Sequence, residues 1–526
     1  MKNNIVFLIV LLCLFSSCGD FLEEYSQDLT YAKTAADLDE ILIGDGYMQV
    51  PDVGAEIVGL ENSEGPYFPW IHVMDDDITE YAEGSNAEGT VMTELRNFYS
   101  WGAYPCMIEN EEKKDVAWKR LYKHISAINV ILSKTGEIHD FPEEIERIKG
   151  ECHFLRAVYY FYLVNFYAKP YSKVSATTDL GVPLKTKEYV EDIYFQRNTL
   201  EETYTQILND LRTAASLLKG KKHKTIYRAG YYAVHAMLSR VYLYMEDYEH
   251  VLQSADTVLQ GRYALLDYNE RAALVKPDEW GTIQNGVSVI YKDSPETIFS
   301  QGGNCFLKDL GNAGFTNTCN YTVSENLKEM YNREPGTDLR IGAWLGIYDV
   351  SEYAYIVTKV QKLVDKADGL VSSECLIRLP EILLNKAEAL AMLSRDAEAQ
   401  QLVEELRLRR IKSDNYTPLS VRTGKELIEL IRDERRRELC FEGHRWFDLR
   451  RYAVNSKYPY SEPIIHDCSY FNNNVWSREY QGSYRLEKYE TEAAYVIPIP
   501  RSVIEFNKGN MVDNATRPER EMFKRF

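Results

Sequence analysis

The sequence predicts a mostly α-helical body made of tetratricopeptide-like helix pairs, with a side formed by loops and short strands. Along several stretches, apolar residues recur at spacings of three and four, which is the pattern of a helix with one buried face. Two of these stretches, 227–260 and 376–410, are each interrupted by a short polar turn, as a tetratricopeptide unit is. Between them, the insert at about 266–375 is rich in glycine and carries short β-branched runs, which indicates irregular backbone.

Three single helices are expected before the first pair. An apolar stripe predicts a helix over 116–132, and another predicts one over 143–168, which a Lys-Pro dipeptide ends because the residue before proline avoids helical angles. A third helix over 199–218 begins with a capping-box arrangement of Thr199 and Glu202.

The helix pairs have their turns at Glu246-Asp247-Tyr248 and at Ser394-Arg395-Asp396. Because the insert separates the pairs, we expect one body over 18–526 and no regular tandem array. It divides into a helical N-terminal region at about 18–265, the insert, and a C-terminal region at about 376–526.

Composition limits the kinds of partner. The 526 residues include 61 basic and 80 acidic side chains, a formal net charge of −19, which argues against nucleic acid because phosphate binding needs a basic face. The chain has 39 tyrosines against 19 phenylalanines and 7 tryptophans. A tyrosine has an apolar ring and a polar tip, so this excess favours packing between helices or stacking on ligands. Several of these tyrosines fall inside the predicted helices, which favours packing for most of the excess: Tyr159, Tyr160, Tyr162, Tyr231, Tyr232, Tyr242, Tyr244 and Tyr248.

The N-terminus has the pattern of a secretory signal. After Lys2, the apolar run 5–15 is far shorter than the ~20 residues that cross a bilayer, and small residues precede Cys18. We therefore expect 1–17 to be a signal peptide; the alternative is a buried strand or short core helix. The residues before Cys18 resemble a bacterial lipobox, with Phe15 where leucine is usual, which implies lipidation of Cys18. Acyl chains would then anchor the protein.

The remaining cysteines give no disulfide framework or zinc motif. Seven others are widely and irregularly spaced, and we expect most to be small buried side chains, although Cys305 and Cys319 can pair across a loop. No P-loop, dinucleotide-binding, metalloprotease or serine-hydrolase motif occurs, so neither catalysis nor a cofactor is predicted. The run Asp75-Asp76-Asp77 can ligate calcium, but a loop with side-chain-to-backbone turns explains it better.

The densest charge cluster, 432–438, continues the apolar stripe of a helix with Glu434 and Glu438. Buried charges must be paired, and the neighbouring arginines supply partners three and four residues away. We therefore expect an ionic lattice that locks the last helices to the body, with a structural role.

The segment 432–452, read with 494–500, resembles the C-terminal signature of the SusD/RagB family of Bacteroidetes. The acidic stretch after Cys18 is similar to the surface-export signal of Bacteroidetes lipoproteins. The resemblance implies four tetratricopeptide-like helix pairs and a non-catalytic lipoprotein on the outer membrane, facing outward. It also implies a protein that binds a nutrient glycan and delivers it to a SusC-like TonB-dependent transporter. Alternatives are a peptide ligand, as for RagB-like proteins, a surface glycan hydrolase, or a scaffold without a small ligand.

The resemblance places ligand-binding aromatic residues in the loop ahead of the first long helix and in the insert. It implies stacking on glycan rings by Trp101, Tyr99 and Tyr104, and hydroxyl contacts by Asp76, Asp77 and Tyr81; Trp280 and Trp344 follow from the insert. For each aromatic residue the alternative is packing of a loop onto the helices. On the ligand hypothesis, Trp101→Ala abolishes glycan retention and leaves the thermal transition nearly unchanged.

Overall fold

The computed structural model describes most of the chain. The described residues are 32–49, 67–80, 82–83, 90–108, 111–113, 115–272, 290–302, 321–332, 337–349, 354–357, 359, 371–372, 375–472 and 477–525. The predictions for the signal peptide, Cys18, Tyr81, Trp280 and the pair Cys305 and Cys319 fall outside these residues.

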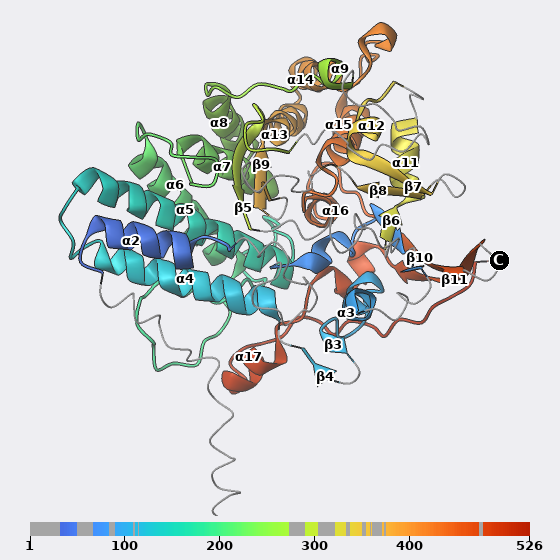
Figure 1. Ribbon diagram of the computed structural model, residues 1–526. Coiled ribbons are helices and arrows are strands. Elements are labelled where there is room, and N and C mark those ends of the chain that lie inside the picture. Colours follow the sequence, from blue (N-terminus) through green and yellow to red (C-terminus); the bar gives the residue numbers. More distant parts are fainter. Residues whose placement is uncertain are drawn as a thin grey trace, which may run out of the picture.

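The mostly α-helical prediction is confirmed, and the main helices follow one another around the body (Figure 1). They are α2 (Ala35–Ile41), α4 (Val116–Lys134), α5 (Pro142–Tyr167), α6 (Leu200–Leu218), α7 (Tyr231–Tyr244), α8 (Tyr248–Leu259), α13 (Leu379–Met392), α14 (Asp396–Leu408), α15 (Gly424–Leu439) and α16 (Arg445–Ala453). The capping box of α6 forms as predicted, with the Glu202 backbone N–H donating to the hydroxyl of Thr199. No helix among the described residues is long and apolar enough to cross a membrane.

The two helix pairs lie side by side although the insert separates them in sequence. Helix α13 packs against both α7 and α8, so the first pair continues directly into the second (Figure 1). Each pair turns through one non-glycine residue with a left-handed backbone, Glu246 at φ 56° and Ser394 at φ 62°. One predicted boundary is wrong: Cys375–Arg378 form the strand β9, and α13 begins afterwards with Pro380 in its first turn.

Apart from the C-terminal hairpin, the strands are short. They pair as β1 (Ile78–Glu80) with β6 (Tyr321–Val323), β3 (Met107–Ile108) with β4 (Glu111–Glu112), β5 (Thr297–Gln301) with β9, and β7 (Leu345–Asp349) with β8 (Ala354–Val357). The longest hairpin, β10 (Ile464–Asn472) with β11 (Ser477–Leu486), is antiparallel and also pairs with β2 (Ala82–Glu83).

Five further α-helices lie among the described residues. They are α3 (Thr90–Tyr99), α9 (Tyr268–Ala272), α11 (Glu325–Asn332), α12 (Arg340–Trp344) and α17 (Arg501–Phe506).

The tyrosines of the helices pack the core, as expected. Tyr159 and Tyr160 are both fully buried, and each hydroxyl donates to a backbone carbonyl, that of Gly46 at 2.6 Å and that of Lys185 at 2.7 Å. The rings thus fill the interior while the polar tips tie loops to α5.

Candidate functional site

The aromatic turn after α3, residues 99–104, points mainly into the protein. Trp101 has no exposed surface, its backbone is left-handed at φ 53°, and its indole Nε1 donates to the carbonyl of Met74 at 2.9 Å. Tyr99 is also fully buried, and its hydroxyl donates to the carbonyl of Asp467 at 2.7 Å. Neither ring offers a free face to a ligand, so both residues pack the loop onto the body.

His466 of β10 explains this burial. Its ring lies between the two aromatic rings, with centroids 4.2 Å from Tyr99 and 4.0 Å from Trp101. Each ring nitrogen lies against a backbone carbonyl, that of Tyr99 at 2.8 Å and that of Asp75 at 2.7 Å. Burial lowers the pKa of His466 to about 4. The three stacked rings hold the aromatic turn, the acidic turn and the C-terminal hairpin together.

The acidic turn, Asp75-Asp76-Asp77, is bound by arginines of α15 and its neighbour α16. Arg445 donates to both carboxylate oxygens of Asp76, at 2.6 and 2.8 Å, and Arg436 donates to Asp77 at 2.8 Å. Although burial opposes the charge, Arg436 and Arg445 lower the pKa of Asp76. The turn is therefore an anchor for the C-terminal helices.

The other two carboxyl groups of the turn are more deeply buried. Burial raises the pKa of Asp75 and of Asp77, and the neighbouring carboxylates raise that of Asp75 further. The backbone N–H of Asp77 donates to Asp75, which is the side-chain-to-backbone turn expected from the sequence. No group of three His, Cys, Asp or Glu side chains among the described residues is arranged to hold a metal ion.

Trp344 is likewise an interior residue and not a free stacking surface. It is fully buried, its Nε1 donates to the hydroxyl of Tyr268 at 3.1 Å, and the ammonium of Lys359 lies 4.0 Å from its ring. Its ring borders a buried charged cluster, since the guanidinium of Arg340 also lies 5.8 Å from the ring centroid.

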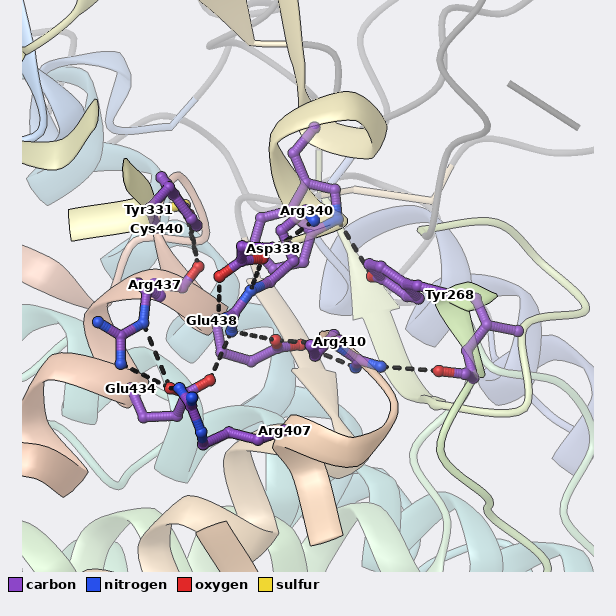
Figure 2. A network of polar contacts seen from close by, with 12 residues as sticks. Tyr268, Tyr331, Asp338, Arg340, Arg407, Arg410, Glu434, Arg437, Glu438 and Cys440 are labelled. Atoms are coloured by element: carbon purple, nitrogen blue, oxygen red, sulfur yellow. Dashed lines mark hydrogen bonds and ion pairs between the residues drawn. The ribbon is translucent and has the colours of Figure 1, made fainter. Parts of the chain in front are cut away.

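That cluster is the ionic lattice expected from the sequence, and it extends further than α15. Three guanidinium groups, those of Arg340, Arg378 and Arg410, reach Glu438, and all four side chains are fully buried. Figure 2 shows the side chains of Arg340 and Arg410 both reaching Glu438. We call this set the Glu438 network; its members are Glu296, Asp338, Arg340, Lys359, Arg378, Arg407, Arg410, Glu434, Arg437, Glu438 and Glu442.

The Glu438 network joins segments from most of the second half of the chain. Arg378 ends β9, Arg410 follows α14 and Arg340 opens α12, so α15 is tied to the insert and to the second helix pair. Burial opposes ionisation, but Arg410 and Arg378 lower the pKa of Glu438 to about 2. Since every charge in the network has a partner, it fixes described parts of the insert, α12 and Lys359, against α15.

Tyr104 and Tyr460 are exposed aromatic residues and are candidates for ligand contact. Tyr104, which the sequence predicts, is 62% exposed. Tyr460, which sequence reasoning missed, is 44% exposed, and its pKa is raised by burial and modulated by the charges of Arg445 and Asp76. A half-exposed ring can offer a stacking face, and the charges that act on Tyr460 belong to a carboxylate–guanidinium pair that can offer hydrogen bonds. The Tyr-Pro-Tyr sequence at 458–460 is the signal that could have identified it.

The thiols of this region are not nucleophiles. Cys440 and Cys468 are buried, and burial raises the pKa of Cys440 to about 12, so its sulfur stays protonated at neutral pH. Cys106, Cys152, Cys375, Cys440 and Cys468 are all free thiols.

Comparison with known proteins agrees with this architecture. A family model described as SusD family matches residues 314–516, and one described as starch-binding associating with outer membrane matches residues 73–243. SusD-like protein P2 of Formosa agariphila is 25% identical in an alignment of 496 residues that covers 87% of this chain and 92% of that protein.

Solved structures establish the same fold. A SusD superfamily protein from Bacteroides thetaiotaomicron superposes with a TM-score of 0.67 at 21% identity, covering 91% of this chain and 99% of the other. A SusD-like carbohydrate binding protein from Bacteroides vulgatus gives a TM-score of 0.64 at 19% identity, covering 91% and 98%.

Proposed function

We propose, since this chain belongs to the SusD/RagB family, that it is an outer-membrane lipoprotein that binds a nutrient glycan. It faces the outside of the cell, is anchored through Cys18, and passes the glycan unchanged to a SusC-like TonB-dependent transporter. The observation that carries the proposal is the match of residues 73–243 to the model described as starch-binding associating with outer membrane. This match includes the acidic turn, the aromatic turn and Tyr104.

The surface chemistry around the acidic turn supports glycan binding. Sugars present flat C–H faces that stack on aromatic rings and hydroxyl groups that bind carboxylates and guanidinium groups. Tyr104 and Tyr460 are exposed rings, and Asp76 keeps 22% of its side chain exposed while it pairs with Arg445. We propose these four side chains as ligand contacts, and we retain Tyr81 and Trp280 as proposed contacts from the sequence.

A peptide is the second candidate ligand. The formal charge of −19 attracts cationic segments, and a peptide receptor with the same fold would use this attraction to bind its ligand. The glycan is preferred because the exposed rings offer stacking faces.

The first experiment is a calorimetric titration of the purified protein with defined oligosaccharides and with cationic peptides, followed by chromatography of the recovered ligand. The proposal predicts saturable binding of one glycan class and recovery of that glycan intact. Binding of peptides alone would support the second candidate. Shortened oligosaccharides in the recovered fraction would show a hydrolase and would contradict the proposal.

A second experiment tests the anchor and the transporter. In the native host, Cys18→Ala is expected to move the protein from the membrane fraction to the soluble fraction, because the acyl chains provide the attachment. Affinity purification of the unmodified protein from solubilised membranes is expected to retain a TonB-dependent transporter. Two results together would contradict this part of the proposal: Cys18→Ala stays in the membrane fraction, and no transporter co-purifies with the unmodified protein.

A further inference from the structure

Arg517 lies in the C-terminal segment that crosses the body after α17. The segment is fixed on both sides of it: the Asn514 side chain donates to the carbonyls of Tyr167 and Ile497, each at 2.8 Å, and Phe523 pairs with Ser483 of β11 through two backbone hydrogen bonds. Arg517 is held between these contacts with only 3% of its surface exposed.

The guanidinium of Arg517 makes no hydrogen bond. Nε, Nη1 and Nη2 are all buried, and none has an acceptor in the described part of the chain. Arg197 packs against the same segment and differs sharply, because it donates to the carbonyls of Gly181 and Tyr167 and to the side chain of Asn514. An unsatisfied buried donor costs about 1–3 kcal/mol, and more when it is charged, so a bare guanidinium needs an explanation.

The charges around Arg517 do not balance. Glu492 is the acidic group whose charge acts most strongly on Arg517. Its carboxylate, however, already pairs with Arg520 and accepts the backbone N–H of Ala494 at 2.9 Å. Two guanidinium groups therefore share one carboxylate, which leaves one positive charge. The Nε of Arg520 is also buried without a partner. Burial lowers the pKa of Arg517 only to about 10, so the side chain remains charged at neutral pH.

We infer that Arg517 and Arg520 bind a small monovalent inorganic anion of the chloride class. One anion would accept from the free N–H groups and would neutralise the excess charge, whereas a water molecule would satisfy the donors and leave the charge in place. The depth of Arg517 excludes an organic ligand from this position. The inference is independent of the glycan proposal, since it concerns a buried ion that stabilises the C-terminal segment.

Crystals of the protein grown in sodium bromide test the site directly through the anomalous signal of bromide. The expected result is a bromide peak in contact with the guanidinium of Arg517. An ordered water there, or bromide peaks at other positions only, would overturn the inference. This measurement uses the unmodified protein, so it decides the question even if variants fail to fold.

Thermal unfolding in solution gives a second test. A bound anion raises the stability of the folded state by mass action, so the melting temperature should be higher in sodium chloride than in sodium gluconate of equal ionic strength. Arg517→Met is expected to lose this difference. Arg197→Met, the matched control, is expected to melt earlier in both salts and to keep the difference. A chloride effect of equal size in Arg517→Met and the unmodified protein would overturn the inference.

Discussion

Helix α15 and the aromatic turn after α3 both bury side chains that are often found at surfaces, but they differ in what fixes them. In α15, Glu434 and Glu438 are completely buried and each is held by guanidinium groups. In the aromatic turn, Trp101 is equally buried, but it is held by the ring of His466 and one carbonyl. A buried charge requires a partner, whereas an aromatic ring is stable in either environment, so only the first kind of burial can be anticipated from local sequence.

The largest effect is expected from breaking the Glu438 network. Glu438→Ala removes the carboxylate that three buried guanidinium groups share, and such a change costs about 3–5 kcal/mol of unfolding free energy. Urea unfolding at neutral pH measures it. Glu505→Ala is the control, because its pair with Arg501 is exposed and should contribute about 1 kcal/mol or less. Equal effects in the two variants would contradict the structural role of the network.

Trp101→Ala tests the other half of the comparison. Removing the indole empties a closed site beside His466, and such truncations cost about 3–5 kcal/mol. This expected loss of stability replaces the prediction from the sequence, in which Trp101→Ala loses only glycan retention. An unchanged thermal transition in Trp101→Ala would mean that the ring does not pack as the structure shows.

Acid should remove the stabilisation that the Glu438 network gives to the fold, because its carboxylates become protonated. The folded-state pKa of Glu438 lies at about 2, below the ordinary value of 4.5, so its contribution is present above pH 4.5 and is lost as the pH falls toward 2. Glu434 and Glu442 of the network, and Asp448 of α16, which pairs with Arg435 and Arg451, also have lowered pKa values and act in the same direction. The unfolding free energy, measured by urea titration at several pH values, should therefore decrease over this range. Constant stability down to pH 3 would exclude the ion pairs as a major source of stability.

A carboxyl group of the acidic turn should show the opposite sign. Burial raises the pKa of Asp75 above its ordinary 3.8, so its contribution is present below pH 3.8 and is lost as the pH rises through the raised value. Asp75→Asn keeps an oxygen for the backbone N–H of Asp77 and removes the charge. We expect this variant to be slightly more stable than the unmodified protein at neutral pH. A clear loss of stability at neutral pH, measured by urea unfolding, would show that the ionised carboxylate is needed.

The elements with a local cause could be predicted from the sequence. Thr199 caps α6 through its own hydroxyl, and the helix pairs show apolar spacing within single segments. The charge spacing of 432–438 identifies an ionic lattice, but its partners Arg340, Arg378 and Arg410 come from other segments and cannot be read from α15 itself.

The errors have a common physical origin in long-range contacts. The run Cys375–Arg378 is apolar enough for a helix, and it becomes a strand because β5 pairs with it. Trp101 turns inward through a left-handed backbone toward His466, a partner that the sequence around it does not reveal. Tyr460 was missed because its candidate role depends on Asp76 and Arg445, which only the fold brings near.

The central claim is that exposed loop rings contact the glycan while buried rings hold the fold. Calorimetric glycan titration and urea unfolding of Tyr104→Ala test it most directly, with the unmodified protein as reference. Because Tyr104 is 62% exposed, we expect the unfolding free energy to change by at most about 0.5 kcal/mol and the glycan dissociation constant to rise about tenfold. An unchanged dissociation constant together with a loss of stability would contradict the claim.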